Sequence, residues 1–231
     1  MDTAKDARIL ILEDALRRLE GIFSKRLLRF QVDYNQLLNL LGEAKEAYYA
    51  IKYSYMEPQE LRTSESLKTL TNAIKKFKSI YTTARDERGF KPTKTSEKRL
   101  LAETEYVFRV VFGFHNRLTR PPNPAFAIDI LCVEITQVSD VEESDNLLAC
   151  RCTDGSRIWR VLTNIDSVES GMRMAVGVLP PAELMGRVSE AMFLHRTPLA
   201  KDTLLGFLDE PPQEALDQAA AQVVNITEKV K

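Results

Sequence analysis

Apolar residues in the first half of the chain recur every three or four positions, which is the spacing of one face of an α-helix. The pattern begins with Ile9, Leu12, Leu16, Leu19 and Phe23. It continues to Ile51, and the stretch 6–54 contains no proline. This stretch predicts either one long helix, which would need a coiled-coil partner, or two helices, the second capped by Asp33.

Two further helices are predicted before residue 120. The apolar positions of the first are Leu67, Leu70, Ile74, Phe77 and Tyr81. This helix begins after the capping residues at 63–64 and ends at Gly89. The second begins at 95–96 and runs to about Asn116. Its segment 106–114 is apolar on nearly all sides, so it predicts either the buried centre of a helical bundle or a strand.

Beyond the proline-rich segment 120–124, apolar and polar positions alternate, as they do in β-strands. The alternation predicts five short strands, at 127–138, 147–152, 157–163, 173–179 and 191–194. We expect a turn at 154–155, and we expect the prolines at 180–181 to end the fourth strand. Five short strands of this total length are typical of an OB-fold barrel, which protects its sheet edges by near-closure. An amphipathic helix is predicted after the prolines at 211–212.

Together these patterns predict an α+β protein of two domains. A helical domain, either a bundle or a coiled coil, is expected at 1–119, followed by a Pro-rich linker at 120–125. A five-stranded OB-fold β-barrel is expected at 126–200, and a C-terminal extension with a helix at 201–231. No apolar stretch approaches the roughly 20 residues that cross a bilayer, so we expect no membrane partner.

The net charge of −1 conceals an unequal distribution of charge. Residues 1–123 carry 23 Lys and Arg against 16 Asp and Glu, a net charge of +7. Residues 124–200 carry 6 against 11, a net charge of −5, and contain no lysine. Opposite charge in the two halves predicts modules that bind different partners or attract one another.

The cysteines and histidines of the sequence do not indicate a catalytic or metal-binding site. Cys132, Cys150 and Cys152 form an odd, sparse set, which favours a reduced, cytoplasmic setting over a disulfide framework. The pair at 150 and 152 is interpreted as two core residues on one strand face, because no second pair accompanies it to complete a metal site. The only histidines, His115 and His195, lack ligand spacing, and no phosphate-binding or nucleophile motif is present. We therefore expect no catalysis, no metal and no cofactor.

The stretch 161–194 carries a motif in which a leucine and a proline precede a glycine and a final S-E-A-M run. Its residues are Leu179, Pro181, Gly186, Ser189, Glu190, Ala191 and Met192. With this motif, residues 126–196 resemble the tRNA-binding domain of EMAP-II-like cytokine precursors and of the C-terminal extensions of some methionyl-tRNA synthetases. The resemblance implies an OB-fold that binds tRNA through a basic face. The sequence departs from the family at Pro180, Glu183 and Met185, where basic residues are usual.

Candidate nucleic-acid-binding residues fall into two groups. Those of the barrel half are Arg157, Trp159, Arg160, Arg173, Arg187, Ser189 and Met192. Those of the helical half are Lys75, Lys76, Lys78, Arg85 and Arg88, which belong to a basic run that continues to Arg99. Arg157 and Trp159 share one strand face and could form a platform for a base, the alternative being that Trp159 lies in the barrel core.

These observations predict a non-catalytic RNA-binding accessory protein, with tRNA as the RNA. An aminoacyl-tRNA synthetase is a candidate partner, and the helical half is expected to supply cations and to form a homo-oligomer. The alternative is a protein–protein scaffold whose OB-fold has lost RNA binding, which Glu183 and the absence of lysine from 124–200 favour. The choice depends on cations, because counterion release supplies much of the affinity for a phosphate backbone.

Overall fold

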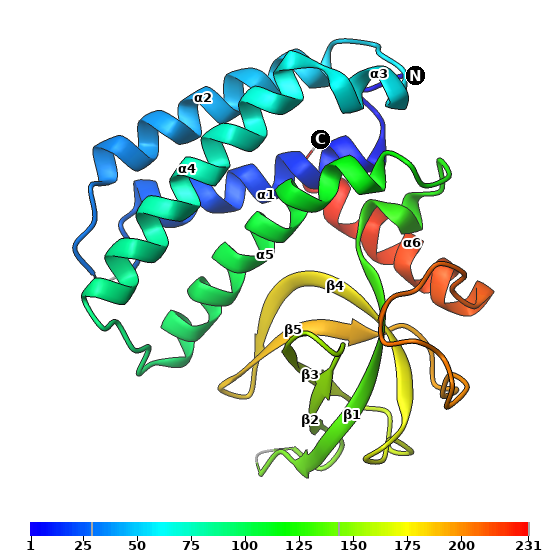
Figure 1. The fold of residues 1–231 in the computed structure, drawn as a ribbon. Helices are drawn as coiled ribbons and strands as arrows, with labels where there is room; N and C mark the ends of the chain where they lie inside the picture. Colours follow the sequence, from blue (N-terminus) through cyan, green and yellow to red (C-terminus); the bar gives the residue numbers. More distant parts are fainter. Residues whose placement is uncertain (29, 143, 231) are drawn as a thin grey trace.

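The computed structural model describes residues 1–28, 30–142 and 144–230. A layer of helices covers a strongly curved sheet, and a last helix runs along one side of both (Figure 1). The helices of the first half are α1 (Ala7–Ser24), α2 (Tyr34–Lys52), α3 (Pro58–Thr63), α4 (Glu65–Glu87) and α5 (Thr95–Arg117). The helices that pack along each other are α2 with α4 and α1 with α5.

The stretch 6–54 forms two helices, so the prediction of a single long helix is wrong and its alternative is confirmed. The Asp33 carboxylate caps α2 by accepting a hydrogen bond from the backbone N–H of Gln36 (3.0 Å). The short helix α3 was not predicted from the sequence. Its proline at the first helical position is suited to a helix start, because that N–H needs no partner there.

Helices α4 and α5 begin and end within about two residues of the boundaries predicted from the sequence. Ser64 caps α4 by accepting a hydrogen bond from the backbone N–H of Leu67 (3.2 Å). The segment 106–114 lies within α5, so its interpretation as a strand is wrong. Its apolar character is explained by burial on several sides, because α5 packs against α1, α4 and the sheet.

The sheet contains β1 (Ile130–Asp140), β2 (Leu148–Thr153), β3 (Ile158–Thr163), β4 (Arg173–Leu184), β5 (Arg187–Phe193) and the short β6 (Gly206–Phe207). The first five strands pair in a closed ring in the order β1-β2-β3-β5-β4-β1, and β6 extends the edge of β1. All pairings are antiparallel except that of β3 with β5, which meet at the single pair Val161 and Ala191. The ring is therefore only just closed between β3 and β5.

The prolines at 180–181 do not end β4, which corrects the expectation from the sequence. The strand continues to Leu184, and its register with β5 shifts between Val178 and Ala182. Proline lacks the N–H of a regular ladder, so this irregularity is where the strand tolerates it. The turn follows at 185–186, where both residues have positive φ (+45° and +65°), as a two-residue hairpin requires.

The remaining elements join the two layers. A 3₁₀-helix (Pro124–Ala127) leads from α5 into β1, and α6 (Gln213–Thr227) packs against it and against α1. The predicted α+β fold, with a helical first half, a five-stranded sheet and a C-terminal helix, is confirmed. Among the described residues, no helix is both long enough and apolar enough to span a bilayer.

A buried ion-pair cluster fixes α5 to the start of β1. The Asp129 carboxylate accepts hydrogen bonds from Arg117 Nη1 (2.5 Å) and from Arg109 Nε (2.7 Å). The Asp129 and Arg117 side chains are only 4% and 6% exposed. The Arg109 guanidinium also lies over the ring of Trp159, 5.0 Å from its centroid. One acidic residue thus joins two arginines of the helical layer to the sheet.

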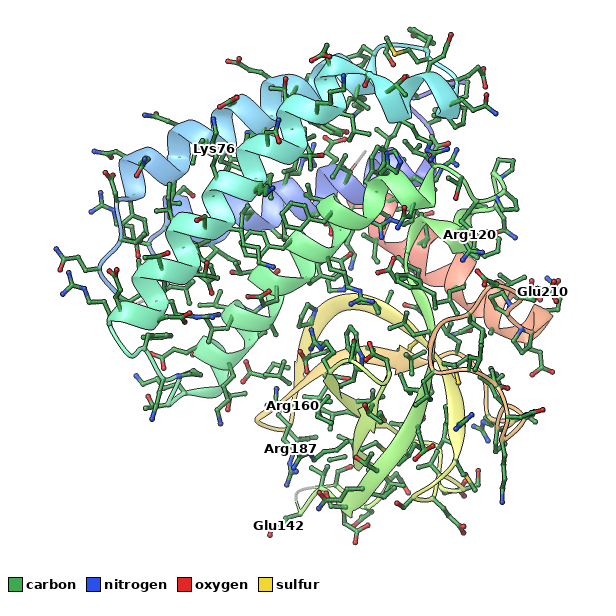
Figure 2. The ribbon with its side chains drawn as sticks, in the orientation of Figure 1. Lys76, Arg120, Glu142, Arg160, Arg187 and Glu210 are labelled. Carbon is green, nitrogen blue, oxygen red and sulfur yellow. The ribbon has the colours of Figure 1, made fainter. Side chains whose placement is uncertain are left out.

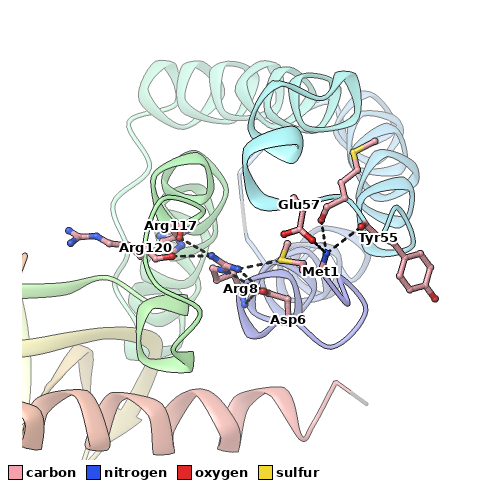
Figure 3. Close-up of polar contacts among 8 residues, drawn as sticks. Met1, Asp6, Arg8, Tyr55, Glu57, Arg117 and Arg120 are labelled. Atoms are coloured by element: carbon pink, nitrogen blue, oxygen red, sulfur yellow. Dashed lines mark hydrogen bonds and ion pairs between the residues drawn. The ribbon is translucent and has the colours of Figure 1, made fainter.

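A second buried arginine holds the end of α5 (Figure 3). Arg8 of α1 donates from Nη1 to the carbonyl oxygens of Arg117 (3.5 Å) and Arg120 (3.3 Å), and it is paired with Asp6. The last carbonyls of a helix have no intrahelical partner, and a cation is favourable beside them. The amino group of Met1 bonds nearby to the carbonyl oxygen of Tyr55. The start of α1 therefore fixes the point at which the chain leaves α5 for the sheet.

Candidate nucleic-acid interface

A groove lies between the outer face of β1, β2 and β3 and the first turns of α5. Its volume is about 450 Å³. Four cationic side chains from four different elements line it: Lys98, Arg151, Arg160 and Arg187. None of the described residues that line it is acidic. We call these residues and the space between them the cationic groove.

The alternation of β2 and β3 places two of these arginines outward. Cys150 and Cys152 point into the core of the sheet, so Arg151 between them points away from it. Trp159 is buried in the same way, and the next residue, Arg160, is exposed. The two arginines are direct cross-strand partners in the register of β2 and β3. Two like charges therefore stand opposite each other on one face of the sheet.

The β4–β5 turn and α5 bring the other two cations to the same place. The Thr95 hydroxyl donates a hydrogen bond to the carbonyl oxygen of Gly186 (2.8 Å), which holds the turn against the start of α5. Arg187 follows the turn directly, and Lys98 lies one helical turn beyond Thr95 on the same side of α5. Figure 2 shows Arg160 and Arg187 at the edge of the sheet, below the start of α5.

Most of this positive charge is not neutralised within the described chain. Arg160 Nη1 lies 3.5 Å from Glu190 Oε2, but the arginine side chain is 71% exposed. Lys98, Arg151 and Arg187 make no ion pair with any residue that the structure describes. The cationic groove is therefore a local concentration of positive charge beside a sheet whose part of the chain, residues 124–200, has a negative total charge.

The predicted aromatic platform is not available to a ligand in this conformation. Trp159 is 2% exposed, and its indole nitrogen donates a hydrogen bond to Asp154 Oδ2 (2.9 Å). Guanidinium groups lie over its ring at 4.0 Å for Arg157 and at 5.0 Å for Arg109. Arg157 is further held by Glu190 (2.5 Å). Trp159 is a core residue, as the alternative interpretation of the sequence had it.

Asp154 organises the β2–β3 turn that precedes this tryptophan. Its Oδ1 accepts hydrogen bonds from the backbone N–H groups of Ser156 (2.8 Å) and Arg157 (2.9 Å), and Gly155 takes a positive φ of +87°. Burial alone would raise the pKa of Asp154, but these bonds and the one from Trp159 stabilise the charged form and lower the pKa to about 2. The turn predicted at 154–155 is confirmed.

Other predicted site residues have structural partners. Ser189 is buried, and its Oγ accepts a hydrogen bond from the N–H of Leu162 (3.0 Å) and donates one to the carbonyl oxygen of Ala191 (2.9 Å). The neighbouring Glu190 accepts the N–H of Arg160 (3.3 Å). These two side chains satisfy backbone donors of β3 where β5 provides only one backbone pair.

The last two predicted residues of the barrel half lie outside the cationic groove. Arg173 donates to the carbonyl oxygen of Thr203 (2.5 Å) and lies 3.5 Å from Glu134. Met192 lines a different cavity, beyond the groove. Of the predicted barrel residues, the structure therefore brings Arg160 and Arg187 together.

The basic residues of α4 form a separate surface. Lys75, Lys76 and Arg88 are exposed, whereas Lys78 and Arg85 both lie near Glu105. Helix α5 lies between α4 and the sheet (Figure 1), and Lys76 lies on the far side of α5 from Arg160 and Arg187 (Figure 2). The two predicted groups do not share one face.

Two residues of the cationic groove were missed in the predicted site. Lys98 belongs to the basic run that ends at Arg99, but its position at the start of α5 gave no sign of the sheet beside it. Arg151 had a signal, because it alternates with the two core cysteines and must therefore point outward. Burial raises the pKa of the Cys150 thiol to about 11 and that of Cys152 to about 12, and both face the core as interpreted. Within the described ranges, no group of three or more His, Cys, Asp and Glu side chains could hold a metal ion.

Comparisons with known proteins place the helical half in a family. A family model described as an alpha helical domain matches residues 1–120, which make up just over half of the chain and contain α1 to α5. A comparison with curated proteins finds no match. The match contains Lys98 of the cationic groove, whereas the three arginines lie beyond it. The chain belongs to the alpha helical domain family.

Proposed function

We propose that this protein is a non-catalytic RNA-binding protein that holds RNA backbone in the cationic groove. The observation that carries the proposal is the cross-strand pair of Arg151 and Arg160. Like charges directly opposite each other destabilise a sheet, by roughly 0.2–1 kcal/mol. A phosphate bound between them would convert this repulsion into attraction, and Lys98 and Arg187 lie where they can contact neighbouring phosphates.

The location of the groove supports nucleic acid as the ligand. OB-folds bind oligonucleotides on the face of strands 2 and 3, between the loop that joins strands 1 and 2 and the loop that joins strands 4 and 5. The cationic groove lies on β2 and β3 beside the β4–β5 turn. Because residues 126–196 resemble the tRNA-binding domain, we propose tRNA as the RNA and an aminoacyl-tRNA synthetase as the partner. We propose a cytoplasmic location, where three buried thiols remain reduced.

The helical half takes part in this function by completing the groove. The negative total charge of the barrel argues against phosphate binding by the barrel alone. Lys98 adds a cation from α5, and the bond between Thr95 and Gly186 keeps α5 beside the β4–β5 turn. RNA bound here would contact both halves of the chain.

A salt titration with a charge-reversal variant tests the proposal. Four phosphate contacts predict a slope of log affinity against log salt of roughly −3, which is about a 50-fold loss between 50 and 200 mM salt. We expect Arg151→Glu combined with Arg160→Glu to lower tRNA affinity more than tenfold in filter binding. The matched control is Lys75→Glu with Lys76→Glu on α4, which makes the same change in net charge and should leave the affinity within about twofold. A loss confined to the α4 variant would place RNA on α4 instead and refute the groove.

A protein–protein scaffold is the second candidate, and an exposed aromatic cluster favours it. Tyr49, Tyr53, Tyr55 and Met56 are all exposed where α2 ends, and the rings of the first two are stacked (centroids 6.5 Å apart). Contiguous exposed apolar side chains of this kind often mark protein contacts. A protein retained on the immobilised chain after nuclease treatment, together with no tRNA affinity at 50 mM salt, would favour this candidate.

A further inference from the structure

A second cavity, of about 520 Å³, opens next to the cationic groove where β3 and β5 diverge. The two strands meet at Val161 and Ala191 and separate beyond them, and the cavity extends from that point to α6. Leu147, Leu162, Leu184, Met192 and Leu194 form much of its apolar wall, and the polar residues that line it are Thr163, Asn164, His195, Arg196 and Gln218. We call it the side cavity. Its volume is within the range of small-ligand sites.

The side cavity and the cationic groove adjoin each other. Leu162 lines both of them. Leu184, which lines the side cavity, is the direct cross-strand partner of Arg187, which lines the groove. A ligand with a charged backbone in the groove can therefore place an attached group in the side cavity.

The chemistry of the side cavity differs from that of the groove. Apolar walls suit the flat faces of a ring, and a few polar groups beside such walls can fix its orientation. His195 Nε2 is buried and has no hydrogen-bond partner among the described residues. Burial lowers the pKa of His195, which keeps the imidazole neutral, so that Nε2 can either donate or accept a hydrogen bond according to its tautomer. Neighbouring atoms cover this nitrogen, and a base that displaces them would give Nε2 the hydrogen-bond partner that it lacks.

We propose that the side cavity receives an unpaired base of the RNA strand whose phosphates lie in the cationic groove. The proposal rests on the proposed function and names its substrate class: RNA with at least one unpaired nucleotide. Unpaired bases can be turned away from the strand, packed against side chains and hydrogen-bonded on their edges, whereas the bases of a duplex cannot. The base would lie between Leu162 and Leu184, with an edge toward His195 Nε2.

Binding of three short RNA probes tests the proposal. The first probe is a single strand, the second is the same strand without its bases, and the third is a blunt duplex of equal length. We expect the protein to bind the single strand at least fivefold more tightly than the abasic strand, because burying a base against side chains contributes that much or more. Leu184→Ala combined with His195→Ala should remove this preference and leave the affinity for the abasic strand unchanged. The matched control, His115→Ala, changes an exposed histidine on α5 and should keep the preference.

Failure of this proposal can be told from failure of the proposed function. Equal affinity for the single strand and the abasic strand, or a preference that survives in the double variant, overturns the side-cavity proposal alone. The proposal that the cationic groove binds RNA is still supported in that case if Arg151→Glu with Arg160→Glu weakens binding of both strands. No affinity for any of the probes at 50 mM salt overturns both. If the double variant does not fold by circular dichroism, His195→Phe removes both ring nitrogens, keeps an aromatic side chain and should reduce the same preference.

Discussion

Replacing Asp129 with alanine is expected to weaken the attachment of α5 to the sheet more than any surface change. The carboxylate is 4% exposed and accepts hydrogen bonds from Arg117 and Arg109. Arg117 is almost as buried, and its Nε already has no partner within the described chain. Without the carboxylate, Arg117 would keep its charge in the interior with only the Val110 carbonyl oxygen as an acceptor.

The magnitude follows from this burial. Removing one partner of a buried ion pair typically costs about 3–5 kcal/mol, because the other charge stays desolvated and uncompensated. Arg109 is partly exposed and can turn toward water, so it should add little to the loss. Since a domain is stable by only about 5–15 kcal/mol, Asp129→Ala should lose a large part of its free energy of unfolding.

Urea unfolding measures this loss, and a second variant tests its cause. Asp129→Ala should lower the urea midpoint with an unchanged slope. Asp129→Leu combined with Arg117→Met leaves no buried charge at this position, so it should recover most of the lost stability. A loss below about 1 kcal/mol for the single variant would refute the reasoning and would mean that apolar packing alone holds α5.

Three further predictions concern other positions. Arg151→Gln removes a like-charge pair and should therefore raise the free energy of unfolding by about 0.2–1 kcal/mol. The same change should lower the affinity for tRNA. A lower midpoint in thermal unfolding would contradict the expected gain in stability. The pKa of Asp154 is about 2 in the folded chain, below its value in the unfolded chain. The charged carboxylate therefore adds about 2 kcal/mol to the free energy of unfolding above pH 5, and this contribution is lost as the pH falls from 4 to 2. Asp154→Asn should therefore flatten the fall in urea midpoint over that range, and an equally steep fall would argue against the low pKa. Gly113→Ala should cost about 1–3 kcal/mol in urea unfolding, because the new Cβ would lie 2.6 Å from Arg117 Nη1. In an Arg117→Met background the same change should cost much less, and an equal cost in both backgrounds would argue against this clash.

Local signals in the sequence predicted most elements of the fold. The caps Asp33 and Ser64 mark the starts of α2 and α4, because a side-chain oxygen that bonds an orphan backbone N–H acts within a few residues. Helix α3 was missed because six residues are too short to show a period. The end of β4 was misplaced because the proline rule is local, whereas the register shift that accommodates the prolines depends on β5.

The candidate site was harder to predict, for a physical reason. Its four cations come from α5, β2, β3 and β5, so no short window of the sequence contains more than two of them. The summed charge of residues 124–200 gave no sign of the cationic groove, because none of the described residues that line the groove is acidic. Trp159 could be assigned to the core or to the surface from its sequence, and only the two guanidinium groups that cover its ring decide the question.

The way in which Ser189 and Glu190 complete the ring has a consequence for how such proteins can diverge. Their side chains accept hydrogen bonds from the backbone N–H groups of Leu162 and Arg160, so this chain needs them to close the ring whether or not it binds a ligand. The outward-pointing guanidinium groups at 151 and 187 contribute nothing to that closure. Substitutions at these outward-pointing positions can therefore change which ligand the sheet binds without disturbing the closure of the ring.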